Sequence, residues 1–200
     1  MCAARCGIEL PNCRACGICS VLLQFVNGAI LSTSLRDQFA EDIDAVRGGC
    51  YFSYMYVLAK GIKQDPVRRW ALPDRVFFAC GACHILAYAF LARYPDAGFK
   101  PIWIKPAKGY TGNHIAAVNG DYAFDYHGHS SWNRLLEHAN RKANRWWTGW
   151  HAELIELPPD VLVSEAKSRE YEGLWLREPR QFLHDAMPRA VDFLERFPPP

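Results

Sequence analysis

The chain has 200 residues, of which 50% are hydrophobic and 14% aromatic, so it is long and apolar enough to fold around a buried core. Its formal net charge is +2 and its basic residues form no long run, which argues against nucleic acid or an acidic membrane surface as a partner. The apolar stretch at residues 21–31 is too short to span a bilayer, and the sequence does not show the charged, apolar and small-residue pattern of a secretory signal peptide. We therefore expect a cytoplasmic protein whose cysteines are reduced.

Residues 1–54 differ in composition from the rest and are expected to form a cysteine-rich N-terminal extension. Met55 begins a sequence that reads as an alternative start, so we hypothesise that this extension is absent from the native protein. Peptides found N-terminal to Met55 in the native protein would contradict that hypothesis. If the extension is native, Cys13, Cys16 and Cys19 have a spacing suited to a zinc or iron–sulfur site.

The first strong pattern downstream is a buried helix. The apolar residues after Cys83 recur at helical spacing as far as Tyr94, and the sequence from Pro95 to Gly98 ends the helix. A strand is expected over residues 100–105, followed by a loop rich in glycine and lysine over residues 106–112.

The next segment has the strongest hairpin signal in the chain. The dipeptide Asn119-Gly120 lies between two apolar runs, as in a two-residue turn that needs positive φ at both positions. With this dipeptide as the loop, Val118 pairs with Asp121 and His114 faces Asp125. Directly opposed residues share one face of a sheet, so the register brings an imidazole beside a carboxylate.

The rest of the chain is expected to be mainly helical. Ser130 or Ser131 can cap a helix from Trp132 to about Asn144, and residues 152–157 can form another strand. Beyond two prolines, we expect a short helix from Asp160 and a longer one over residues 178–197 that Pro188 kinks. The sequence thus predicts an α+β protein with a core over residues 55–157 and a helical C-terminal appendage over residues 158–200.

Three of these residues suggest covalent chemistry. Cys83 lies at a helix start, where the helix dipole and the first-turn N–H groups favour a reactive thiolate. His114 would exchange protons with the thiol and the leaving group, and Asp125 would orient the imidazole. We expect the backbone N–H groups of Cys83 and His84 to stabilise an oxyanion.

The segment CGACHILAYAF (residues 80–90) resembles the Cys-Gly-Ser-Cys-Trp-Ala-Phe signature of papain-type proteases. In that family the second cysteine is the nucleophile, which by resemblance implies Cys83. The order Cys, His, Asp and the short spacing from His114 to Asp125 are more similar to the transglutaminase-like branch of cysteine nucleophile enzymes, here a bacterial one. The match covers residues 80–128 and departs from papain in two ways, since no glutamine precedes Cys83 closely and the histidine lies nearer the cysteine.

The resemblance implies a papain/transglutaminase-like core in which a helix that begins with the cysteine packs on a small antiparallel sheet. It also implies a cysteine hydrolase or acyltransferase that needs no cofactor and acts on a peptide or protein substrate. Residues expected near the site as accessories are Cys80, His84 and His127. Amide or isopeptide hydrolysis, deamidation and transglutamination share one covalent step, so the sequence does not separate them.

Two other interpretations use the same residues. The pair Cys80 and Cys83 has zinc-site spacing, and His84, His127 or His129 could complete a metal site. The same fold could instead be a catalytically inactive binding module. The tryptophans of the C-terminal half are expected to pack in the core rather than to form a groove.

Overall fold

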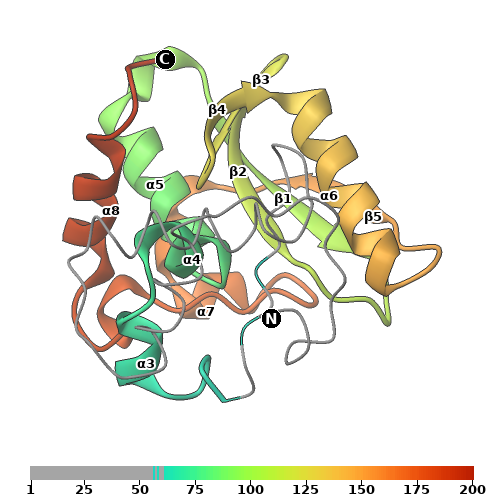
Figure 1. The fold of residues 1–200 in the computed structure, drawn as a ribbon. Coiled ribbons are helices and arrows are strands. Elements are labelled where there is room, and N and C mark those ends of the chain that lie inside the picture. The colour runs from blue at the N-terminus through green and yellow to red at the C-terminus, as the bar shows by residue number, and fades with distance from the viewer. Residues whose placement is uncertain (1–55, 57, 59–60) are drawn as a thin grey trace, which may run out of the picture.

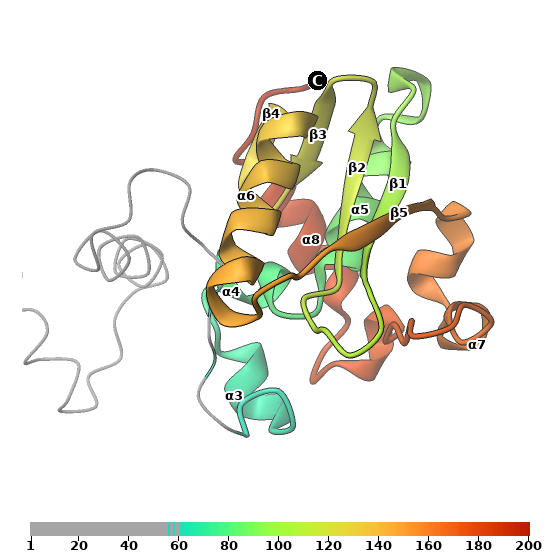
Figure 2. The ribbon, with the colours of Figure 1, turned by 90° about the vertical axis from the view of Figure 1, so that its right-hand side faces the viewer.

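The computed structural model describes Tyr56, Leu58 and residues 61–200. An antiparallel sheet with the strand order β4-β3-β2-β1-β5 forms its centre. Helices cover both faces of this sheet (Figures 1 and 2). The mixed helix-and-sheet class predicted from the sequence is therefore confirmed, whereas the expected extension of residues 1–54 and its cysteines lie outside the described residues.

Five strands build the sheet: β1 Lys100–Pro106, β2 His114–Asn119, β3 Tyr122–Asp125, β4 Gly128–Ser131 and β5 Ala152–Glu156. The sequence predicted four of them and took the β4 residues for a loop. That part of the prediction is wrong because the chain reverses tightly after β3. Gly128 has a φ of +93°, which glycine tolerates, and it pairs with Asp125 across a two-residue turn.

The helices are α3 Pro66–Trp70, α4 Asp74–Ala79, α5 Cys83–Arg93, α6 Trp132–Trp146, α7 Glu165–Ser168 and α8 Ala186–Leu194. Short 3₁₀ turns occupy Pro95–Ala97, Pro159–Val163 and Pro179–Gln181. The expected helices at Cys83 and Trp132 are confirmed, and Ser131 caps the second by accepting from the N–H of Arg134. None of the helices in the described part of the chain is long and apolar enough to cross a membrane.

Alternating side chains of β2 and β3 serve two different cores. Ala117 and Phe124 face α5 and α8, which lie together behind the sheet in Figure 2. Ala116 and Ala123 face α6, which covers the other side. Because both faces are covered, the central strands are buried almost throughout, and strand alternation places His114 and Asp125 on the α6 side.

The hairpin between β2 and β3 forms with a register two residues away from the predicted one. Asn119 pairs with Tyr122, so the loop is Gly120-Asp121 rather than Asn119-Gly120. The side-chain amide of Asn119 donates to the carbonyl of Ala97 at 2.7 Å, which holds Asn119 in the strand. Since strand side chains repeat every two residues, the slip keeps every residue on its predicted face.

The C-terminal segment forms shorter helices than predicted. Instead of one kinked helix over residues 178–197, a 3₁₀ turn is followed by α8, which Asp185 caps by accepting from the N–H of Met187. Pro188 therefore lies in the first turn of α8, where its missing N–H costs nothing. The helix expected from Asp160 is a 3₁₀ turn, followed by α7 with Ser164 as its cap.

Residues after 158 contribute to the same hydrophobic clusters as the segment expected to be the core. Phe193 and Leu194 of α8 pack against α5. Leu162 and Leu174 belong to the cluster that contains Cys83 and Trp103. The C-terminal segment therefore covers the helix that begins with Cys83.

Candidate active site

Cys83 is the first residue of α5, and the buried side chain of Arg69 supports the turn before it. After α4 ends, Gly81 adopts a φ of +112°, and its carbonyl accepts a hydrogen bond from Nη2 of Arg69 at 2.9 Å. A Cβ on Gly81 would lie 3.0 Å from that nitrogen. Glycine is therefore required for both the backbone conformation and the approach of Arg69.

His114 and Asp125 form a buried hydrogen-bonded pair, as predicted, although they lie diagonally rather than directly opposite. Nε2 of His114 is 3.0 Å from Oδ2 of Asp125, and Asp125 is 4% exposed. A carboxylate oxygen can only accept, so Nε2 of His114 carries the proton and Nδ1 is left to face other groups.

Asp125 also binds His127, the second residue of the tight turn. The backbone N–H of His127 donates to Oδ1 of Asp125 at 2.8 Å, and Nδ1 of the same histidine lies 3.1 Å from that oxygen. Burial alone would raise the pKa of Asp125, but the charge of His127 and hydrogen bonds from both histidines hold it well below its usual range. Asp125 is therefore a fixed negative charge behind His114.

Cys83 contacts two imidazoles. Burial acts to raise the pKa of its thiol, but hydrogen bonds to His114 and His84 outweigh burial and lower the pKa to about 5. The pKa of His114 is raised to about 10, since hydrogen bonds to Asp125 and Cys83 overcome the opposing effect of burial. Around neutral pH the pair is therefore a thiolate beside an imidazolium, with the two titrations coupled.

His84 holds the other side of the sulfur and is itself anchored to the C-terminal segment. Its Nε2 lies 2.9 Å from the carbonyl oxygen of Arg177, so Nε2 donates and Nδ1 is the nitrogen left for Cys83. His84 is 2% exposed, so this second partner is shielded from solvent.

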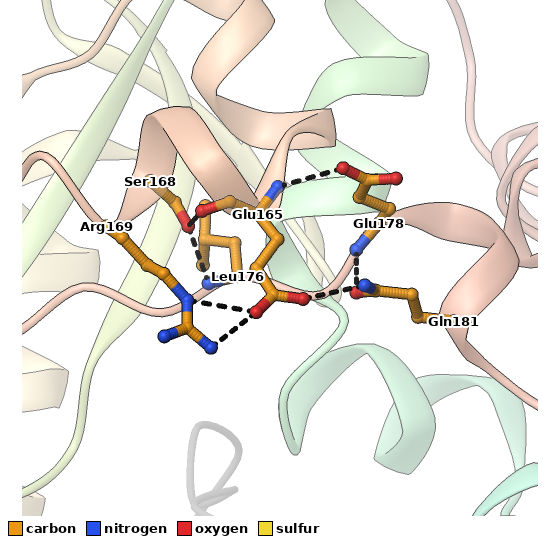
Figure 3. A network of polar contacts seen from close by, with 6 residues as sticks. All are labelled: Glu165, Ser168, Arg169, Leu176, Glu178 and Gln181. Atoms are coloured by element: carbon orange, nitrogen blue, oxygen red, sulfur yellow. Dashed lines mark hydrogen bonds and ion pairs between the residues drawn. The ribbon is translucent and has the colours of Figure 1, made fainter.

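A polar network fixes the two residues that flank Arg177 (Figure 3). The N–H of Leu176 donates to Oγ of Ser168 at 3.0 Å, and the N–H of Glu178 donates to Oε1 of Gln181 at 2.8 Å. Glu165 joins these groups, since its carboxylate accepts from Gln181 and Arg169. The C-terminal segment thereby sets the orientation of His84.

The start of α5 also offers backbone donors. The first helical hydrogen bonds run from Ile85 and Leu86 to the carbonyl of Ala82. The N–H groups of Cys83 and His84 precede them, at positions that have no acceptor within a helix. Ala82 provides no side-chain cap, so these donors are available near the sulfur.

Cys80 differs from Cys83 although both are buried. Burial raises the pKa of Cys80 to about 11, so this cysteine stays a neutral thiol at physiological pH, and its Sγ lies 3.7 Å from the carbonyl of Tyr56. The contrast favours Cys83 as the ionised cysteine.

A cavity of about 720 Å³ adjoins the site on the α6 side of the sheet. The residues that line it include Cys80, Gly81, His114 and Asp125, and also residues of α6 and the tryptophans after it. Cys83 is 8% exposed and is not one of the lining residues, whereas its neighbours Gly81 and His114 are.

The chain matches no known protein family. No curated protein and no solved structure is similar to it either.

The structure brings together most of the residues singled out from the sequence. Cys83, His114 and Asp125 are in contact, His84 binds Cys83, and His127 binds Asp125. His129 lies elsewhere, with Nε2 2.9 Å from the carbonyl of Pro198. Cys13, Cys16 and Cys19 lie outside the described residues, and within the described part no three or more His, Cys, Asp or Glu side chains are grouped to hold a metal ion.

Some neighbours of the site were missed. Asn113, the residue before His114, accepts a hydrogen bond from Nε1 of the buried Trp103 at 2.8 Å, which fixes the start of β2. His138 and Lys142 of α6 line the cavity, and the sequence contains one signal for them. They are four residues apart, so they share one face of the helix.

Proposed function

We propose that this protein is a thiol-dependent acyl-transfer enzyme, of the amide or isopeptide hydrolase, deamidase or transglutaminase type. Cys83 is the nucleophile, His114 the acid–base group and Asp125 the residue that orients the imidazole. One observation carries the proposal: the thiol at the start of α5 contacts an imidazole that in turn is bound to a buried carboxylate. This chain of contacts is the arrangement that activates a cysteine nucleophile.

In the first half of the reaction the thiolate of Cys83 attacks the substrate carbonyl carbon and forms a C–S bond. The displaced electron pair resides on the carbonyl oxygen, where the N–H groups of Cys83 and His84 stabilise it. When the oxyanion collapses, the bond to the leaving amine breaks and His114 gives that amine its proton. A thioester on Cys83 and a neutral His114 remain.

In the second half, water or an amine attacks the thioester and gives its proton to His114. The C–S bond then breaks, and the thiolate and imidazolium are regenerated. Water as acceptor gives hydrolysis or deamidation, and an amine gives transamidation. The reaction needs no cofactor, and a peptide or protein is the substrate class we propose.

The proposal is tested by acetylating the full-length protein with p-nitrophenyl acetate, a small activated ester, and locating the acetyl group by mass spectrometry. We expect a thioester on Cys83 that Cys83→Ser abolishes and that the matched variant Cys80→Ser retains. His114→Ala is expected to slow acetylation about 10²-fold, since a positioned acid–base group contributes about 10²–10⁴ in rate. Acetylation of other residues alone, or an unchanged rate in His114→Ala, would show an inactive module instead.

A further inference from the structure

His138 is an imidazole that the triad does not use. It lies on the buried face of α6, is 9% exposed, and its Nε2 has no hydrogen-bond partner among the described residues. A buried polar atom without a partner is costly and rare in folded proteins. Because His138 lines the cavity next to the triad, a bound molecule can supply the missing partner.

The surroundings of His138 are positively charged. Lys142 lies one helical turn further along α6, is 8% exposed and also lines the cavity, as does Lys63. Among the described lining residues Asp125 is the only carboxylate, and its two oxygens bind His114 and His127. A ligand with a negative charge therefore meets two lysines among these described lining residues.

The protonation of His138 responds to this charge. Its pKa is lowered to about 4 by burial first, and then by the nearby charges of His127, Lys142 and Arg141, with Asp125 acting in the opposite direction. In the unliganded protein His138 is thus neutral at pH 7. An anion bound beside it raises its pKa and can convert it to a cationic donor.

Many of the other lining residues are apolar, and three of them are tryptophans. They include Ile104, Leu135, Ala143, Trp146, Trp147 and Trp150. Trp150 is fixed in place, since its Nε1 donates to the carbonyl of Thr111 at 2.9 Å. Such a combination of apolar walls with a few convergent polar groups is typical of a small-molecule or side-chain subsite.

The cavity connects with the triad through a short series of side-chain contacts. The ring of His138 lies 5.8 Å from that of His127, centroid to centroid, and His127 binds Asp125. His114 and Asp125 of the triad line the same cavity as His138.

We propose that this cavity is the substrate's specificity subsite, and that it accepts a carboxylate at His138 and Lys142 with an aromatic or aliphatic group against the tryptophans. The assignment rests on the acyl-transfer function proposed above. The substrate class it defines is an amide or thioester that also carries a carboxylate and an apolar group, such as the C-terminal end of a peptide with an apolar residue.

The test uses 3-phenylpropionate and its neutral amide, 3-phenylpropionamide, with the full-length protein. We expect calorimetry to show binding of the carboxylate at least tenfold tighter than binding of the amide. Nuclear magnetic resonance of ¹⁵N-labelled histidines should show an upward shift of the His138 pKa when the carboxylate binds. Neither measurement needs a variant, so both remain informative if a variant fails to fold.

Two variants, each with a matched control, locate the site. His138→Gln and Lys142→Met are expected to weaken binding of the carboxylate at least tenfold. His151→Gln and Lys108→Met, at exposed positions outside the cavity lining, should leave the affinity within twofold. Absence of binding, equal affinity for acid and amide, or an unmoved His138 pKa would overturn the proposal.

The two proposals can fail separately. Acetylation of Cys83 in the unaltered protein without carboxylate binding would keep the acyl-transfer function and overturn the subsite. Carboxylate binding to a protein whose Cys83 is inert to p-nitrophenyl acetate would overturn the acyl-transfer function, and with it the role of the cavity as a substrate subsite.

Discussion

Gly81→Ala tests how the nucleophile's turn is held. The substitution places a Cβ at a residue with φ of +112°, which costs about 1–3 kcal/mol in backbone strain. That Cβ would lie 3.0 Å from Nη2 of Arg69, whose guanidinium is buried between Gly81 and the ring of Phe182, 4.6 Å away. The arginine must shift at the expense of its 2.9 Å bond to the Gly81 carbonyl, and losing a hydrogen bond to a charged group costs about 1.5–3 kcal/mol.

The matched control is Gly109→Ala. Gly109 also has a positive φ, +93°, but an added Cβ there meets nothing within 4 Å. Urea unfolding at pH 7 should therefore show a loss of about 1–3 kcal/mol for Gly109→Ala and about 1.5–3 kcal/mol more for Gly81→Ala. Gly81→Ala should also slow acetylation of Cys83, two residues further on. Equal losses of stability in the two variants, with unchanged acetylation, would refute the role assigned to Arg69.

Three further predictions concern the charges of the site. His84→Gln keeps a donor for the Arg177 carbonyl but removes an imidazole from Cys83. The absorbance of the Cys83 thiolate should therefore titrate about one pH unit or more above the wild-type pKa of about 5. An unchanged midpoint would mean that His84 does not stabilise the thiolate. Asp125→Asn removes one partner of a buried charged pair and should cost about 3–5 kcal/mol in urea unfolding, and a loss below about 1 kcal/mol would argue that the pair is not ionised. The free energy of unfolding should also depend on pH. Folding lowers the pKa of Cys83 from 9.0 to about 5, so Cys83 stabilises the fold more as pH rises from 5 to 9. Folding raises the pKa of His114 from 6.5 to about 10, so the contribution of His114 is lost as pH rises from 6.5 to 10. His138, whose pKa is lowered from 6.5 to about 4, also stabilises the fold more as pH rises to 6.5. The slopes of Cys83 and His114 oppose each other between 6.5 and 9.0, so the unfolding free energy should rise by about 4 kcal/mol from pH 5 to 6.5, stay level to about 9 and then fall. Cys83→Ser should halve this acidic rise and leave the part that His138 contributes, and a rise of unchanged size in this variant would assign it to groups other than Cys83.

The sequence predicted the parts of the site that depend on local pattern. Cys83 at a helix start follows from the apolar period of residues 83–94 and the Gly81 turn. The contact between His114 and Asp125 was predicted correctly although the predicted strand register was wrong, because a slip of two residues leaves both side chains on the same face of the sheet. The alternation of strand side chains therefore predicted the correct face for both residues even though the turn residues were misassigned.

The parts that were missed depend on contacts between distant segments. Nothing in the local sequence shows that the carbonyl of Arg177 binds His84, 93 residues away, or that Arg69 supports the Gly81 turn. The strand at residues 128–131 was missed because its four residues carry no strand pattern, and pairing with β3 alone forms it. His138 drew no attention because an isolated histidine on a helix acquires meaning only from the cavity beside it.

The most direct test of the account is the pH dependence of Cys83 alkylation by iodoacetamide, followed by mass spectrometry of the Cys83 peptide in the full-length protein. We predict a rate that rises with a midpoint near pH 5 and changes again near pH 10, when His114 loses its proton. In His114→Ala the first midpoint should move up by at least one unit, while Cys80 shows no reactive thiolate below its pKa of about 11. A Cys83 midpoint between 8 and 9 in the wild type, the range of an ordinary thiol, would contradict the thiolate–imidazolium pair and the acyl-transfer function built on it.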